Sequence, residues 1–323
     1  MTALRTAVHD DAELFGRTVR AACLDAYGDE GEDRSRPFDA GLWRSLGDAG
    51  AWGVATTGGG DVGDAVVVAE VLGSEAVCGP LLQTFLVLTS GLEVDGVESG
   101  DRIAAVADGD TMVPWGGAAD VFVRLDLAAS TVGMARAEPR PRAAATLAGE
   151  PWAEVAVEPV GPTAPAGRAL AVANVVGAAY AVGAGGRALQ LSLDYTAERR
   201  QFGRTLLSYQ TVEHRLAQVG AELDVAADLV VGAGQALERG SDVDFEIAAA
   251  HAAAARLYAT EIATQAGWLG HQLAGGMGFV AGTLLSALST RAQQLRHQPP
   301  PPATVEAATL GWLRSSMPAP ADR

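Results

Sequence analysis

An arginine cluster is the feature of this chain best suited to hold an anionic ligand. Arg187, Arg199, Arg200 and Arg204 fall in one short region of a chain whose formal net charge is −16. A guanidinium group can hold a phosphate through two parallel hydrogen bonds. The cluster also fits a solvated basic helix end, which is favourable near a helix C-terminus. On its own, the cluster leaves both interpretations open, and the second is the simpler one.

Two adjacent glycines form the second candidate binding element. Gly275 and Gly276 follow one helical stretch and precede another. Because they carry no side chain, they leave backbone N–H groups open and allow a phosphate to approach closely. A glycine pair at the end of a helix is more often a plain C-terminal cap, so the pair alone does not identify a ligand.

Three motifs connect the arginines with the glycines. They are Tyr195-Thr-Ala-Glu-Arg-Arg-Gln-Phe-Gly203, Tyr209-Gln-Thr-Val-Glu-His-Arg-Leu-Ala217 and Gln272-Leu-Ala-Gly-Gly-Met-Gly-Phe279. Together they resemble the signature of the flavin-dependent acyl-CoA dehydrogenases, and the third stands at about the family's distance downstream of the first. The resemblance is most specific between about residues 170 and 280. Motifs that match in register are much stronger together than any one of them alone.

The resemblance implies FAD as the cofactor and a flavin site shared between two subunits. In the family, the matching arginine bonds the flavin diphosphate of the neighbouring subunit, the Gln-x-x-Gly-Gly turn lies near the same cofactor, and the aromatic residue packs beside the flavin. The implied cofactor-binding residues are Arg199, Gln201, Phe202, Gln210, Gln272, Gly275 and Gly276. His214 lies in the second motif, and we interpret it as a bundle contact rather than a base. No metal ligand set is expected.

The carboxylate that the resemblance implies for catalysis is missing from both of its expected places. These dehydrogenases remove the α-proton of a thioester with a glutamate while the flavin takes the β-hydride. One place falls near Ala173-Asn174 and the other at or near Pro299–Pro302. An amide such as Asn174 has no useful pKa near neutrality and cannot act as a base. Glu246 and Glu261 are alternative carboxylates, although each also fits an ordinary exposed helix acid.

Two further departures concern the middle of the chain and the segment after Phe279. The Thr-Glu-Pro-x-x-Gly-Ser stretch that lines the flavin ring in the family has no counterpart; only Val113 to Asp120 is similar to the shortened version of small relatives. No acidic residue occurs in Val280–Leu285, where small relatives carry one. The contacts of a flavin ring therefore stay unassigned.

These departures leave two functional hypotheses. The first is an acyl-CoA dehydrogenase-like flavoprotein that catalyses α,β-dehydrogenation of an acyl-CoA thioester together with a partner subunit. The alternative is a non-catalytic or half-site subunit of a heteromer, which donates Arg199 and the glycine turn to a flavin whose base belongs to a paralogous dehydrogenase subunit. A helical scaffold without a ligand ranks last, because it leaves the arginine motif unexplained. Expected partners are the acyl-CoA, an electron-transfer acceptor and a homo- or hetero-oligomeric assembly.

The elements that must position these residues are mainly helical. We expect an N-terminal helical domain over 1–92, a small antiparallel β middle region over 93–160, and a C-terminal four-helix bundle over 161–323, the arrangement of an acyl-CoA dehydrogenase. The β region is shorter than the family's. The second bundle helix shows an apolar seam with alternating spacings of four and three, typical of a bundle. The seam consists of Val212, Leu216, Val219, Leu223, Ala226, Val230, Ala233 and Leu237.

Bulk properties exclude several function classes. The acidic balance argues against nucleic acid and anionic membranes, which are bound by clustered Lys and Arg. A chain of 323 residues with 49% hydrophobic content can bury a sizeable core. No spanning helix or secretory signal is indicated, so the cytoplasm is expected. Cys23 and Cys78 are too few and too distant for a disulfide framework, and buried inert thiols are expected.

Overall fold

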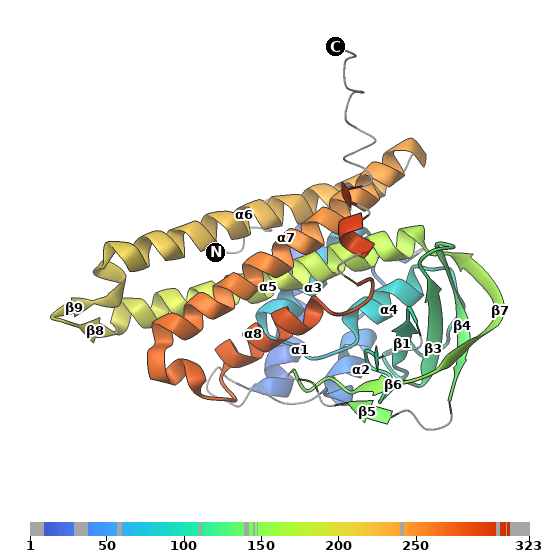
Figure 1. Cartoon of the computed structure of the whole chain (residues 1–323), viewed down its shortest axis with the longest axis horizontal. Helices are drawn as coiled ribbons and strands as arrows, with labels where there is room; N and C mark the ends of the chain where they lie inside the picture. Colours follow the sequence, from blue (N-terminus) through green and yellow to red (C-terminus); the bar gives the residue numbers. More distant parts are fainter. Residues whose placement is uncertain are drawn as a thin grey trace, which may run out of the picture.

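The computed structural model describes residues 10–28, 38–56, 60–109, 112–138, 142–144, 146, 148–239, 242–301, 304–307 and 309–310. Within these ranges, long helices form the body of the molecule and a small β region lies at one end (Figure 1). This confirms the expected fold class. The proposed division into three domains stays a prediction, because one hydrophobic core includes residues of both the N-terminal helices and the C-terminal bundle.

The described residues of the N-terminal part include the helices α1 (Asp10–Tyr27), α2 (Ala40–Asp48), α3 (Val62–Ser74) and α4 (Leu81–Leu88). Asp39 caps α2 by accepting hydrogen bonds from the N–H groups of Gly41 and Leu42. At α3, Asp61 and Asp64 form a reciprocal capping box. Since almost all of α3 and α4 is buried, these two helices are core elements rather than amphipathic surface helices. Cys23 and Cys78 are also buried, as expected.

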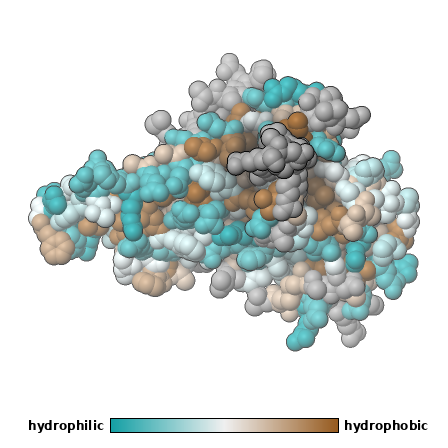
Figure 2. All heavy atoms as spheres, turned by 45° about the horizontal axis from the view of Figure 1, so that its top comes forward, coloured by the Kyte–Doolittle hydropathy of each residue, from teal (hydrophilic) through white to brown (hydrophobic). Residues whose placement is uncertain are grey.

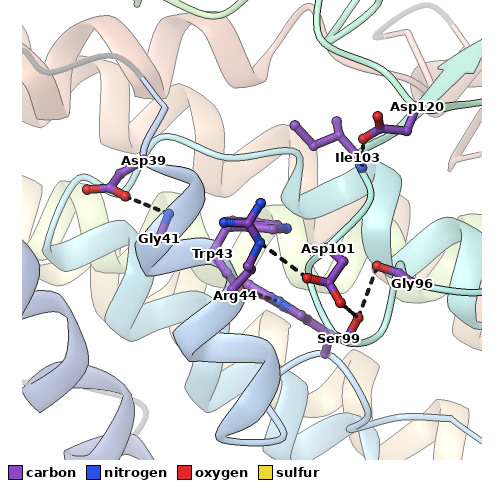
Figure 3. Close-up of polar contacts among 10 residues, drawn as sticks. Asp39, Gly41, Trp43, Arg44, Gly96, Ser99, Asp101, Ile103 and Asp120 are labelled. Atoms are coloured by element: carbon purple, nitrogen blue, oxygen red, sulfur yellow. Dashed lines mark hydrogen bonds and ion pairs between the residues drawn. The ribbon is translucent and has the colours of Figure 1, made fainter.

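Polar contacts join α2 to the segment that leads into the β region (Figure 3). Arg44 Nε lies 3.2 Å from Asp101 Oδ1, and Ser99 Oγ donates to Asp101 Oδ2 at 2.8 Å. Asp120 Oδ2 accepts from the backbone N–H of Ile103 at 2.9 Å. Beneath these contacts, the rings of Trp43 and Trp52 stack with centroids 4.0 Å apart. The ion pair between Arg44 and Asp101 therefore connects α2 to the segment that leads into the β region.

Among the described residues of the β region, the strands form two small sheets. The first has the order β1 (Ala104–Ala107), β3 (Val121–Asp126), β4 (Thr131–Ala137) and β7 (Val157–Pro165). The second has the order β2 (Met112–Val113), β6 (Trp152–Glu154) and β5 (Arg142–Ala144). All pairs in these two sheets are antiparallel except β1 with β3, which is parallel. The expectation of a purely antiparallel region was therefore wrong at this one pair.

Strand β7 extends past the boundary that we placed at residue 160. It contains Pro159, Pro162 and Pro165, and proline is tolerated in a strand only where the missing N–H is not needed. The strand lies at the edge of its sheet, next to β4 alone, so one of its sides makes no ladder bonds. The edge position explains why the prolines do not end the strand.

The C-terminal bundle contains α5 (Gly167–Glu198), α6 (Gln210–Arg239), α7 (Asp242–Ala274) and the shorter α8 (Leu284–Leu295). A two-stranded hairpin, β8 (Arg200–Gln201) and β9 (Arg204–Thr205), joins α5 to α6 and projects from one end of the molecule (Figure 1). The predicted seam of α6 is confirmed, since seven of its eight residues are buried and Val212 is partly buried against the same core.

Helix α5 lies in the middle of the core. Its length and composition would allow it to cross a membrane, but 89% of its apolar window is buried inside the protein. Glycines allow its backbone to touch that of α3. A Cβ atom on Gly73 would collide with the carbonyl of Tyr180, and one on Gly183 would collide with the carbonyl of Glu70. The two helices therefore pack at a distance that no larger residue permits at either position.

Candidate functional site

A cavity of about 530 Å³ lies between the N-terminal halves of α5 and α7. Its volume falls within the roughly 300–1,000 Å³ of small-molecule sites. Leu170, Ala171, Phe245, Ala249, Ala250 and Ala253 give it apolar walls. Small side chains predominate on the α7 wall, which leaves the cavity wide. The cavity can therefore accept a bulky apolar group.

The two places where a catalytic carboxylate was expected meet at this cavity. Asn174 of α5 and Pro300 of the segment after α8 both line it. Neither can remove a proton. Glu246 is the carboxylate among the described lining residues. Glu261 lies elsewhere on α7, where its Oε2 is 2.9 Å from Arg296 Nη1. Of the two alternative carboxylates, the structure therefore brings only Glu246 to the cavity.

Arg256 holds the polar wall of the cavity in place from behind. Its side chain is buried, and it donates to Asn174 Oδ1 at 3.1 Å, to the Leu295 carbonyl at 3.2 Å and to the Gln298 carbonyl at 2.6 Å. Burial lowers the pKa of Arg256 to about 9, which still leaves the guanidinium charged at neutral pH. Sequence reasoning missed this residue. The sequence did contain a signal, because Arg256 directly follows the apolar run Ala252–Ala255. A charged side chain in an apolar helix requires hydrogen-bond partners when it is buried.

A second buried network fixes the segment that carries Pro300. Glu150 accepts from Trp152 Nε1 at 2.7 Å and from Gln298 Nε2 at 2.9 and 3.0 Å. Gln83 Nε2 in turn donates to Gln298 Oε1 at 3.1 Å. Burial raises the pKa of Glu150 to about 7, although the hydrogen bond from Trp152, the charge of Arg291 and the hydrogen bond from Gln298 oppose this rise. The network joins the β region, α4 and the segment after α8.

The arginine motif lies at the opposite end of α5. Arg199 ends the helix, and the hairpin after it turns at Phe202 and Gly203, both with positive φ. Phe202 is 94% exposed. Tyr209 steadies the hairpin by donating from its hydroxyl to the Gln201 carbonyl at 3.0 Å. The side chains of Arg199, Gln201 and Gln210 are exposed, so they are available to a ligand or a partner.

The glycine turn lies at the same end of the bundle. Residues Gly275–Phe279 form a 3₁₀ helix after α7, and Phe279 is 93% exposed. A Cβ atom added to Gly275 or Gly276 would meet no atom within 4 Å, so the backbone of the turn is open.

Side-chain contacts connect the turn to the arginine motif. Arg215 Nη1 donates to Gln272 Oε1 at 3.0 Å, and the Tyr195 hydroxyl donates to the Ala274 carbonyl at 3.4 Å. His214 is exposed beside Gln210, away from the cavity. The structure thus brings the predicted cofactor residues together at one end. The exposed guanidinium of Arg199 suits a diphosphate, and the glycine turn leaves room for a ligand to approach its backbone.

The cavity and the arginine–glycine end are far apart within one chain. Asn174 and Arg199 lie near opposite ends of α5, and the helix between them is about 37 Å long at a rise of 1.5 Å per residue. A ligand of dinucleotide size is shorter than this distance. Within the described ranges, no three His, Cys, Asp or Glu side chains are grouped so that they could hold a metal ion.

Comparisons of sequence place these features among known proteins. A family model described as acyl-CoA dehydrogenase, C-terminal domain, matches residues 165–297. Acyl-CoA dehydrogenase IpdE2 of Mycobacterium tuberculosis is 30% identical over 259 residues, which cover 75% of this chain and 77% of that protein. Probable acyl-CoA dehydrogenase YngJ of Bacillus subtilis is 37% identical over 103 residues, which cover 32% of this chain and 26% of that protein.

Solved structures show the same fold. A putative acyl-CoA dehydrogenase of Mycobacterium smegmatis has a TM-score of 0.79 at 20% identity, with 96% of this chain and 99% of that chain covered. The ChsE4-ChsE5 complex from Mycobacterium tuberculosis has a TM-score of 0.72 at 22% identity, with coverage of 97% and 99%. PigA with FAD and proline has a TM-score of 0.80 at 16% identity, with coverage of 96% and 99%.

Proposed function

The chain belongs to the acyl-CoA dehydrogenase family, and from this premise we propose that it is an acyl-CoA dehydrogenase-like flavoprotein that acts with a partner subunit. The reaction is the α,β-dehydrogenation of an acyl-CoA thioester. The family implies FAD, which accepts the hydride from the β-carbon when it is bound. We place the acyl group in the apolar cavity between α5 and α7, and we place the protein in the cytoplasm.

The observation that carries the proposal is the distance between the two ends of α5. One chain cannot bring its arginine–glycine end and its cavity to the same FAD. We therefore propose that each end serves a different flavin site and that each flavin site contains residues of two chains. In this assignment, Arg199 binds the diphosphate in a charge-assisted contact. Gln201, Gln210, Gln272 and the open backbone of Gly275 and Gly276 surround the cofactor.

Exposed hydrophobic side chains support an oligomer. Phe202 and Phe279 project from the arginine–glycine end almost fully exposed. Val225, Leu229, Ile247 and Trp268 are further exposed apolar residues of α6 and α7. Figure 2 shows hydrophobic side chains gathered near the middle of the visible face. Burying exposed apolar surface contributes about 25 cal/mol per Å². The arginine–glycine end and the exposed apolar residues of α6 and α7 therefore suit contact with a second subunit.

The source of the base decides between two forms of this proposal. In the first, Glu246 takes the α-proton, because it is the carboxylate among the described lining residues of the cavity. In the alternative, the chain is a half-site subunit, and a paralogous dehydrogenase subunit supplies the base. The ChsE4-ChsE5 complex and the Tcur3481-Tcur3483 steroid ACAD are fold neighbours whose names record two different chains. An electron-transferring flavoprotein is also a fold neighbour, and we propose an acceptor of this kind.

The test is to purify the chain alone and after co-expression with a paralogous acyl-CoA dehydrogenase subunit. We expect a flavin absorption spectrum, little acyl-CoA oxidation by the lone chain with an artificial electron acceptor, and clear oxidation by the co-expressed pair. Turnover by the co-expressed pair that Glu246→Gln abolishes would support the first form, and turnover by the pair that survives this change would support the half-site form. Robust turnover by the lone chain would contradict the need for a partner subunit. An absence of flavin from every preparation would contradict the proposed function itself.

A further inference from the structure

Asn174 presents a hydrogen-bond donor to the cavity in the place where a carboxylate was expected. Arg256 Nη1 lies 3.1 Å from Asn174 Oδ1. A guanidinium group has five N–H donors and no acceptor. The atom of Asn174 that faces Arg256 must therefore be the amide oxygen, and the Nδ2 group must point away from Arg256. Chemistry thus fixes the orientation of this amide.

The cavity is the environment left for the Nδ2 group. Asn174 is only 6% exposed, yet its side chain lines the cavity. Among the residues that the structure describes, the hydrogen bond from Arg256 is the one that Asn174 makes through its side chain. The N–H groups of Nδ2 are then available to a ligand. A donor held within apolar walls gains more from a ligand acceptor than an exposed donor does.

We propose that Asn174 Nδ2 donates a hydrogen bond to an uncharged carbonyl oxygen of the bound acyl-CoA, and that Arg256 is the positioning residue that orients the amide. This inference rests on the proposed function, because it assumes that an acyl-CoA occupies the cavity. An uncharged oxygen fits better than a carboxylate, since Glu246 lines the same cavity and would repel an anion. The positive charge of Arg256 is already directed at three neutral acceptors.

The carbonyl could come from either of two parts of the substrate. At the thioester carbonyl, the bond would withdraw charge from the carbonyl and stabilise the negative charge that develops on its oxygen as the α-proton leaves. The proton itself would go to a carboxylate elsewhere, since Asn174 cannot accept it. At a ketone within the acyl group, the same donor would select oxygenated acyl chains over plain hydrocarbon chains.

Three CoA derivatives separate these sources in a binding experiment. Hexanoyl-CoA carries the thioester carbonyl, hexyl-CoA is a thioether without any carbonyl, and 5-oxohexyl-CoA is a thioether with a ketone in the chain. Calorimetric titration uses the flavin-loaded full chain in the assembly in which it is purified. We expect one carbonyl probe to bind about 2- to 10-fold more tightly than hexyl-CoA, as one neutral hydrogen bond predicts. Asn174→Ala should abolish this preference.

Several variants make the result specific. Asn174→Asp keeps the acceptor for Arg256 and removes the donor, so it should also lose the preference, and it serves if Asn174→Ala does not fold. Arg256→Gln offers an acceptor as well as a donor, which frees the amide to turn and should reduce the preference. Ser192→Ala is the matched control, because Ser192 is a buried polar residue of the same helix that bonds its own backbone at Ala188.

The outcomes distinguish this inference from the proposed function. If the wild type binds neither the thioethers nor the thioester, the role of Asn174 and the proposed function are both overturned. Binding with the same carbonyl preference in wild type and Asn174→Asp, or with no preference in the wild type, would overturn the role of Asn174 alone. An unchanged preference in folded Arg256→Gln would overturn the positioning role of Arg256.

Discussion

Glu150 should make the stability of this protein fall as the pH rises toward neutrality. Its side chain is 7% exposed, and burial raises its pKa from 4.5 to about 7. The folded protein therefore binds a proton more tightly at this position than the unfolded chain does. In that case the contribution of Glu150 is fully favourable below about pH 4.5 and is lost as the pH rises through about 7. The size of the loss follows from the same two values. Each tenfold difference in proton affinity corresponds to about 1.4 kcal/mol, so the stability lost between the two pKa values is about 3 kcal/mol.

The variant Glu150→Gln isolates this contribution because it stays neutral at every pH. We would measure the free energy of unfolding in urea for wild type and variant, at several values between about pH 5 and about pH 8. The stability of the variant relative to wild type should rise by about 2 to 3 kcal/mol across this range. The loss of one acceptor for Trp152 or Gln298 shifts the whole curve of the variant but does not change its slope.

Glu154→Gln is the matched control, since Glu154 is an exposed carboxylate in the same segment and pairs with Arg142 at 3.6 Å. It should show no comparable rise. Parallel curves for wild type and Glu150→Gln would refute the argument, because they would mean that Glu150 binds protons equally in the folded and unfolded states.

The remaining predictions concern the two ends of α5. Arg199→Ala should lose a charge-assisted contact worth about 1.5–3 kcal/mol and so lower the flavin content after gel filtration. Arg239→Ala, at the far end of α6, should leave the flavin content unchanged. Equal flavin content in the wild type and both variants would contradict the assignment of Arg199 to the flavin diphosphate. Phe202→Ser should weaken assembly at the hairpin, and sedimentation at several concentrations would show a smaller assembly than that of the wild type. A wild type that sediments as a flavin-loaded monomer would contradict this prediction. Asn174→Glu should restore only weak acyl-CoA oxidation in the lone chain. The reason is that Arg256 would lower the pKa of the new carboxylate by roughly 1–3 and so weaken it as a base. Strong activity with a neutral pH optimum would show that Arg256 does not control the pKa at this position.

Local patterns predicted the parts of the fold that depend on nearby residues. The seam of α6 follows from helical periodicity, which requires only the residues of one helix. The turn at Gly275 was predicted from a motif in which two adjacent glycines follow a helical stretch. The roles of these residues toward a flavin stay predictions, since they depend on a ligand and on a second chain.

Contacts between distant segments could not be predicted in the same way. The bond between Gln298 and Glu150 joins residues 148 positions apart, and neither residue differs locally from an ordinary surface side chain. Arg256 stands in an alanine-rich helix and meets Asn174, 82 positions earlier, only after α5 and α7 pack. The parallel pairing of β1 with β3 likewise depends on a crossover that short β-like runs do not reveal.

The close packing of α3 on α5 limits how this protein can be divided. The carbonyls of Glu70 and Tyr180 occupy the space that side chains at Gly183 and Gly73 would need, so each helix is shaped to receive the other. In a fragment that begins near residue 161, the apolar face of α5 that packs against α3 would be exposed to water, because α3 would be absent. We therefore expect the bundle, expressed by itself, to aggregate or to recruit a foreign helix. Domain-exchange chimaeras within this family should carry α3 and α5 as a matched pair from one parent.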